Sequence, residues 1–201
     1  MLHQPVGTFV GVVGVLHDSL AGSLVVASPS MVDPHFEHAV VLMVEHSDQG
    51  AMGLVINQPM ATKVDEVWDQ VSVLPCPVDQ SLMCGGPCDG PLMLLHDRPR
   101  QAQVEVCRGV CFTADEPMVR ELLSDDPESM RYFVGYAGWG PGQLEDELGQ
   151  GGWLVTKAHA NVVFDADADD GLWMRVITSI DRSIAMLAMN PKLVPRDPSM
   201  N

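Results

Sequence analysis

The sequence is poor in basic residues. Eleven lysines and arginines stand against 27 aspartates and glutamates, which leaves the 201-residue chain with a formal net charge of −16. Nucleic-acid affinity depends on neutralising phosphates with basic side chains, so this balance disfavours direct nucleic-acid binding. Arg98, Arg100 and Arg108 come closest to a basic cluster, and we interpret them as solvated side chains. The charge suits a positively charged partner, or simply solubility.

Long hydrophobic runs are also missing. The longest apolar stretches, around residues 9–16 and 39–44, fall far short of the ~20 residues of a transmembrane helix. No positively charged stretch precedes them, as a secretory signal would require. We therefore expect a cytosolic protein that has no membrane segment. With 46% hydrophobic and 19% charged residues, the composition is that of a packed globular chain.

Cysteine is scarce and odd in number. Five cysteines in a chain without an export signal argue against a disulfide framework. Four of them form two C-x3-C pairs, "CGGPC" and "CRGVC", at positions Cys84, Cys88, Cys107 and Cys111. Structural zinc sites more commonly use C-x2-C spacing. We interpret the cysteines as small buried hydrophobic residues, with a redox or metal role as the alternative; the sequence leaves open whether the four approach one another.

Valine-rich strand patterns alternate with short helical patterns along the chain. The runs "SLVVAS" from Ser23 and "AVVLMVEH" from Ala39 are continuously apolar, which is typical of strands covered on both faces. The polar "SDQG" and then "AMGLVIN" follow, so residues 39–57 predict an antiparallel hairpin. Further strands are predicted at residues 91–96, 103–107, 110–114, 131–138 and 151–157, and helices at 63–71, 115–125, 141–151 and within 171–187. Elements interleaved without a regular βαβ period predict an α+β fold.

One domain is expected, over residues 1–189, because the chain has no internal repeat and no long linker. Residues 190–201, "NPKLVPRDPSMN", carry three prolines and no apolar period. We interpret them as a polar tail, or as an extended arm against a neighbour.

Several motifs occur in a characteristic order. They are the stretches from Leu24 to Pro59, from Cys84 to His96 and from Gly135 to Leu148, followed by "WLV", "VVFD" and "LW". Together they cover roughly residues 20–180 and resemble the YqgE/AlgH family of bacterial proteins. The resemblance implies a compact, intracellular α+β domain with a bent or split, largely antiparallel β-sheet flanked by short helices. It implies no established enzymatic activity.

Some members of that family are labelled transcriptional regulators. This chain has no helix-turn-helix signature, and its charge argues against direct DNA binding. An indirect regulatory role stays open. One departure is visible in the motif "GGP", which the family usually follows with valine, whereas this chain has Cys88.

The segment "GWGPGQLEDE" raises the possibility of an anion site. Pro141 suits the first position of a helix, with Gly140 as its cap. The next free amides, including those of Gly142 and Gln143, could then hold a carboxylate or phosphate against the ring of Trp139.

A structural alternative exists for the same segment. Glu145 and Glu147 follow closely and could satisfy the positive end of the helix themselves. The glycines would then only allow close packing between helix and strand. We favour this interpretation over the anion site.

A second polar segment, "VDPHFEHAVVLMVEH", contains six potential metal ligands: Asp33, His35, Glu37, His38, Glu45 and His46. Zinc needs ligands that converge, and nothing in this spacing makes them do so. We therefore predict no metal site, and no cofactor. The resemblance maps Asp33, Phe36, Glu45 and His46 onto recurrent family positions, but not His35 or His38.

Two classes of function stay open. The first is a regulatory or interaction module that binds a protein or a small anionic ligand through its glycine-rich segments. The second is an enzyme whose site gathers Asp33, His46, His96, Gln143 and Glu145 from separate motifs. Side chains that meet in one concave pocket would favour the enzyme, and dispersed ones the module. The candidate ligand-binding residues are Asp33, His46, Gly85, Gly86, His96, Trp139, Gly142, Gln143 and Glu145.

Overall fold

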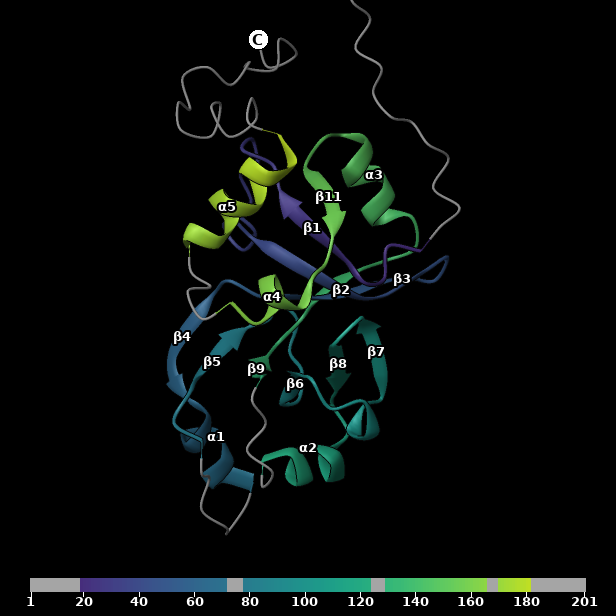
Figure 1. Cartoon of the computed structure of the whole chain (residues 1–201). Coiled ribbons are helices and arrows are strands. Elements are labelled where there is room, and N and C mark those ends of the chain that lie inside the picture. Colours follow the sequence, from purple (N-terminus) through teal and green to yellow (C-terminus); the bar gives the residue numbers. More distant parts are fainter. Residues whose placement is uncertain (1–18, 72–77, 124–128, 166–169, 182–201) are drawn as a thin grey trace, which may run out of the picture.

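Two β-sheets that pack on each other form the centre of the molecule (Figure 1). The computed structural model describes residues 19–71, 78–123, 129–165 and 170–181. Within them, the first sheet, sheet A, has the strand order β10-β3-β2-β1-β11, and sheet B has the order β4-β5-β9-β6-β8-β7. Only β5 and β9 pair in parallel among these strands, so the prediction of a split, largely antiparallel α+β fold is confirmed.

The strands of sheet A are β1 (Ser23–Ala27), β2 (Val40–Ser47), β3 (Gly50–Val55), β10 (Ala137–Trp139) and β11 (Trp153–Lys157). Those of sheet B are β4 (Pro59–Lys63), β5 (Ser81–Cys84), β6 (Met93–His96), β7 (Val104–Cys107), β8 (Val110–Thr113) and β9 (Met130–Val134). The helices are α1 (Val64–Val71), the 3-10 turn η1 (Pro99–Gln101), α2 (Glu116–Leu123), α3 (Gln143–Gly149), α4 (Ala160–Val163) and α5 (Asp170–Ile180).

The last four residues of β1 and the first five of β2 are buried on both faces of sheet A, as their continuous valine-rich runs predict. Alternate residues of a strand point to opposite faces, so Leu24 and Val26 contribute to the core between the sheets. Val25 and Ala27 contribute instead to a second core, which α3 covers. A third core lies where α1 and α2 cover the outer face of sheet B. The helices thus flank the two sheets, and α5 adds its apolar face to the central core.

One predicted strand, over residues 131–138, is wrong. The structure divides it into β9 in sheet B and β10 in sheet A. The break falls at Gly135, whose φ of +72° lies in the left-handed region, where glycine is the favoured residue. The chain therefore changes sheets at this point.

The predicted helix over residues 141–151 begins later than expected. Gly142, with φ +74°, stands at its N-cap and Gln143 is its first residue, so Pro141 lies in the preceding turn. A left-handed residue cannot continue a helix, and this places the start two residues beyond Pro141.

The hairpins of β2 with β3 and of β7 with β8 are confirmed.

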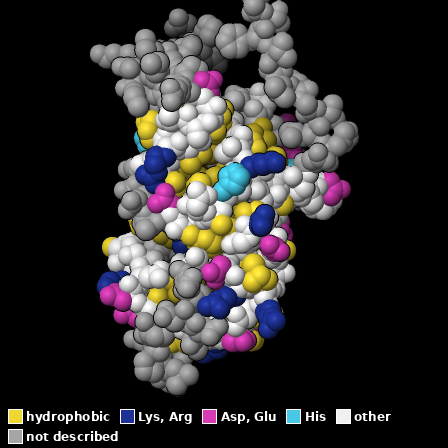
Figure 2. Space-filling view, viewed as in Figure 1, with side chains coloured by type: hydrophobic (Ala, Val, Ile, Leu, Met, Phe, Trp, Pro, Cys, Tyr) yellow, Lys and Arg dark blue, Asp and Glu magenta, His cyan; other side chains and the backbone are white. Residues whose placement is uncertain are grey.

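Four short elements, β4, β5, α4 and the 3-10 turn η1, had no prediction, and the predicted tail at residues 190–201 lies outside the described residues. None of the described helices is long and apolar enough to cross a membrane. On the face shown in Figure 2, acidic and basic side chains are interspersed and apolar ones lie between them.

Candidate functional site

A pocket opens beside α3, with a volume of about 360 Å³. We call it the aromatic pocket. The loop before β2, strand β10, helix α3 and the start of β11 supply its walls. Its lining residues are Ser30, Met31, Val32, Asp33, Phe36, Gly138, Trp139, Gln143, Glu147, Gln150, Gly152 and Trp153.

Three aromatic rings form a cluster in this pocket. Phe36 stacks on Trp139 with their ring centroids 6.1 Å apart. Trp153 meets both rings edge-on, at 5.3 Å from Phe36 and 6.0 Å from Trp139. The two tryptophans are only 5% and 3% exposed, so the rings are held in place by packing on sheet A as well as by one another.

A single carboxylate connects the two tryptophans. Glu147 Oε2 accepts the indole N–H of Trp139 at 3.0 Å and that of Trp153 at 2.7 Å. Its other oxygen accepts the side-chain amide of Gln143 at 2.9 Å. Gln143 and Glu147 are four residues apart, which places them on one face of α3. The carboxylate is thereby fixed in orientation beside the aromatic rings.

The start of α3 does not offer the free amide of Gln143 that an anion site would use. The amide of Gln143 donates to the carbonyl of Gly140 at 3.1 Å. The side-chain oxygen of Gln143 in turn accepts the amide of Gly140 at 3.0 Å. With Asp33 and Glu147 both lining the pocket, its charged side chains are carboxylates, which favour a positively charged ligand over an anion.

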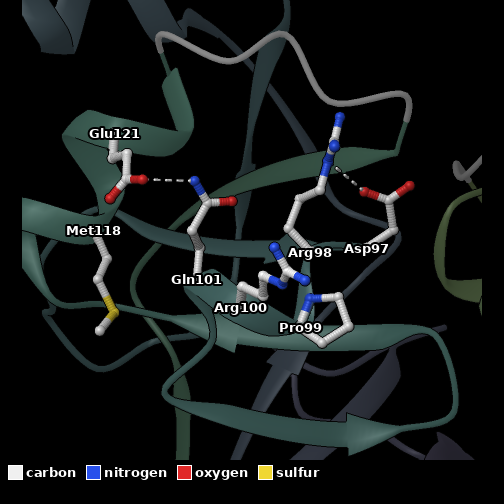
Figure 3. Close-up of a pocket in the computed structure, with 7 residues that line it drawn as sticks. All are labelled: Asp97, Arg98, Pro99, Arg100, Gln101, Met118 and Glu121. Carbon is white, nitrogen blue, oxygen red and sulfur yellow. Dashed lines mark hydrogen bonds and ion pairs between the residues drawn. The ribbon is translucent and has the colours of Figure 1, made fainter.

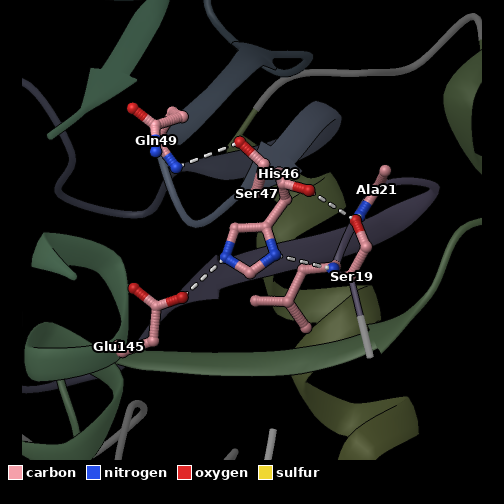
Figure 4. A network of polar contacts seen from close by, with 7 residues as sticks. Ser19, Ala21, His46, Ser47, Gln49 and Glu145 are labelled. Carbon is pink, nitrogen blue, oxygen red and sulfur yellow. Dashed lines mark hydrogen bonds and ion pairs between the residues drawn. The ribbon is translucent and has the colours of Figure 1, made fainter. Parts of the chain in front are cut away.

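His46 and Glu145 form a pair outside this pocket (Figure 4). The imidazole Nδ1 accepts the backbone amide of Leu20 at 3.0 Å, so Nε2 carries the proton and donates to Glu145 at 2.8 Å. The His46 side chain is 8% exposed. The pair joins β2, the segment before β1 and α3, and it explains why Glu145 does not face the aromatic pocket.

His96 lies in the other sheet, fully buried at the end of β6. Its Nδ1 accepts the backbone amide of Arg98 at 3.2 Å. This ring nitrogen therefore acts as an acceptor. Burial lowers the pKa of His96, so the ring is neutral at pH 7 and its Nε2 carries the proton.

Gly85 and Gly86 serve backbone packing. A Cβ on Gly85 would lie 2.2 Å from the carbonyl oxygen of Gly135. One on Gly86, where φ is +146°, would lie 2.4 Å from the backbone of Tyr136. The end of β5 therefore fits against the crossing from β9 to β10 only because these side chains are absent.

Four cysteines lie in the described part of the chain, and none of them forms a disulfide. In the described residues no group of three or more histidine, cysteine, aspartate or glutamate side chains is placed to hold a metal ion. Cys111 is buried, while Cys84, Cys88 and Cys107 are partly buried. Burial raises the pKa of Cys107 and of Cys111, which keeps both thiols protonated at neutral pH.

The residues proposed for an enzyme are dispersed. Asp33 and Gln143 line the aromatic pocket, His46 and Glu145 pair outside it, and His96 belongs to sheet B. Of the lining residues, sequence reasoning named only Asp33, Trp139 and Gln143 as binding candidates. It did not name Met31, Val32, Phe36 or Trp153 among them. It considered Glu147 only as a partner of the helix dipole. The spacing of four residues between Gln143 and Glu147 could have indicated their shared face.

Known proteins match nearly the whole chain. The model of the AlgH-like family, DUF179, matches residues 24–185. A UPF0301 protein of Streptomyces avermitilis is 36% identical over 194 residues, covering 91% of this chain and 96% of that one. Another UPF0301 protein, of Photobacterium profundum, is 35% identical over 184 residues, covering 86% and 94%. The solution structure of the AlgH protein from Pseudomonas aeruginosa superposes with a TM-score of 0.68 at 28% identity, covering 89% and 96%.

Proposed function

The chain belongs to the AlgH-like family, and from that premise we propose that it is an interaction module whose aromatic pocket binds a positively charged side chain of a partner protein. The carboxylate of Glu147, fixed between two indoles, carries this proposal. A carboxylate offers about four acceptor positions, and the hydrogen bonds from Trp139, Trp153 and Gln143 use three of those of Glu147. One acceptor position therefore remains for an incoming donor.

The pocket walls suit a lysine or arginine side chain. Its alkyl stem can pack on Met31 and Phe36, while its charged end meets the carboxylates of Glu147 and Asp33. Cations are also attracted to aromatic faces. The same walls would repel a phosphate or a carboxylate.

The rim of the pocket indicates a protein partner. Val32 is 92% exposed, the highest exposure among the large hydrophobic side chains of the described residues, and it borders the pocket. Burying it against a partner would remove apolar surface from water. A net charge of −16 would also speed the approach of a basic partner.

The dispersed candidate residues favour a module over an enzyme. Two of the five line the aromatic pocket, and the other three have partners or positions elsewhere. A regulatory effect on transcription would then be indirect and would pass through the bound protein.

An NMR titration tests where a cation binds. The probes are the methylamides of Nα-acetyl-arginine, Nα-acetyl-lysine and Nα-acetyl-glutamate, and the readout is the indole ¹H–¹⁵N signals of the full-length chain. The arginine and lysine probes should shift the signals of Trp139 and Trp153 and leave those of Trp68 and Trp173, which lie in the other two cores.

A variant on the rim extends this test to a protein partner. Val32→Ser removes exposed apolar surface without touching the packed rings. It should weaken binding of an arginine-containing peptide more than binding of the single amino acid. Shifts caused by the glutamate probe alone would contradict the proposal.

A further inference from the structure

A second and larger cavity lies at the other end of the molecule, between the loop after β6 and helix α2 (Figure 3). Its volume is about 750 Å³, within the range of about 300–1,000 Å³ that is typical of small-molecule sites. We call it the arginine pocket. It is lined by Asp97, Arg98, Pro99, Arg100, Gln101, Met118 and Glu121.

We propose that the arginine pocket binds a small anion that also carries a hydroxyl group, such as a phosphorylated polyol or a hydroxy acid. Its anionic group would lie on the guanidinium groups of Arg98 and Arg100. Its hydroxyl would donate to Asp97. Neither the family membership nor the proposed aromatic pocket requires this site.

Polar atoms left without partners are the first support for this site. In the described residues, His96 Nε2, Asp97 Oδ1 and Arg98 Nε are buried and make no hydrogen bond. Arg98 Nε and Asp97 Oδ1 are 3.5 Å apart, which is too long for a normal hydrogen bond. Buried polar groups are nearly always paired, because an unmade hydrogen bond is costly. Of these residues, Asp97 and Arg98 line the pocket, so one unpaired acceptor and one unpaired donor belong to its wall.

The arrangement of charge is the second support. Glu121 accepts the side-chain amide of Gln101 at 3.0 Å, so its carboxylate already has a donor, whereas Asp97 lies 3.5 Å from Arg98 Nε without a hydrogen bond. Arg100 is exposed and forms no ion pair within the described part of the chain. Figure 3 shows Arg98 directed toward Asp97 and Gln101 toward Glu121, with Arg100 drawn between them.

The chemistry of the two arginines selects the ligand class. Guanidinium groups bind phosphate and carboxylate through paired N–H donors. Asp97 and Glu121 would repel a bare anion, whereas a hydroxyl on the same ligand would supply a donor to the carboxylate of Asp97. A ligand with both groups thus matches both the basic and the acidic side chains of the pocket, whereas inorganic phosphate matches only the basic ones.

Isothermal titration calorimetry on the full chain tests the site. The probes are glycerol 3-phosphate, citrate and inorganic phosphate, and the variants are Arg98→Gln and Arg100→Gln. Arg108→Gln is the matched control, because Arg108 is exposed in the turn between β7 and β8 and does not line the pocket. Circular dichroism of each variant verifies that it is folded.

The unchanged chain should bind glycerol 3-phosphate or citrate more tightly than inorganic phosphate. Loss of Arg100 should weaken that binding about tenfold or more, while Arg108→Gln should leave it unchanged. Equal affinity of the Arg100→Gln and Arg108→Gln variants would overturn the proposal, as would the absence of saturable binding by all three probes. These anion measurements do not involve the cationic probes of the aromatic pocket, so failure of one site is distinguishable from failure of the other.

Discussion

Replacing Glu147 by alanine should destabilise the fold far more than its position on a short surface helix suggests. The carboxylate accepts both indole N–H groups of Trp139 and Trp153, and those rings are 5% and 3% exposed. Without Glu147, two nearly buried donors lose their acceptor. Each unsatisfied donor costs about 1–3 kcal/mol, so the free energy of unfolding should fall by about 2–6 kcal/mol.

That loss is a large part of the total stability of a typical domain, about 5–15 kcal/mol. Asp146→Ala is the matched control, because Asp146 is the preceding residue of α3 and is exposed. Its substitution should change stability by at most about 0.5 kcal/mol. The loss of stability in Glu147→Gln should lie between those of Glu147→Ala and Asp146→Ala, since an amide oxygen can still accept a hydrogen bond from an indole.

The measurement is unfolding by urea, followed by tryptophan fluorescence and by circular dichroism. The indole signals of Trp139 and Trp153 in an NMR spectrum of the folded variant should also move. If Glu147→Ala and Asp146→Ala unfold with the same free energy, the carboxylate does not hold the two rings, and the geometry assigned to the aromatic pocket is wrong.

Three further predictions concern other parts of the chain. Gly85→Ala should lower the free energy of unfolding by about 1–3 kcal/mol, because a Cβ there would lie 2.2 Å from a backbone oxygen. Gly149→Ala is the control in the same denaturation assay. Its Cβ would meet nothing within 4 Å, so it should change the free energy of unfolding little. A double-mutant cycle of His46→Gln and Glu145→Gln should give a coupling energy of about 1 kcal/mol; additive losses would contradict their hydrogen bond. Burial lowers the pKa of His96 from 6.5 in the folded chain. As the pH falls below 6.5, His96 is protonated in the unfolded chain before it is protonated in the folded one, so the folded state should lose stability over that range. The His96→Gln variant should lose less stability over that range, and identical pH profiles would refute this.

Local patterns were sufficient to predict much of the fold. The valine-rich runs of β1 and β2 predicted strands covered on both faces, and the structure places them at the centre of sheet A. The break at Gly135 was not predicted, because a change of sheet depends on partners far away in the sequence. Gly85 supplies that context. It packs against Gly135 at the crossing, and its carbonyl accepts the backbone amide of Val55 in β3.

The candidate site was predicted only in part, for the same reason. Asp33, Trp139 and Gln143 do line one pocket, but no local pattern connects them with Trp153. The pairing of Ala27 with Trp153 in sheet A places that ring. The sequence also suggested an anion at the start of α3, where the structure places carboxylates. The arginines that we interpreted as solvated, Arg98 and Arg100, line the other cavity.

The central claim is that the aromatic pocket recognises positive charge. It is tested most directly by calorimetric titration of the full chain with two peptides that differ only in one residue, arginine in one and its uncharged analogue citrulline in the other. Both side chains have nearly the same shape, so the comparison isolates the charge. The arginine peptide should bind about tenfold more tightly, and this advantage should shrink when Glu147 is replaced by glutamine. Equal or tighter binding of the citrulline peptide would contradict the claim.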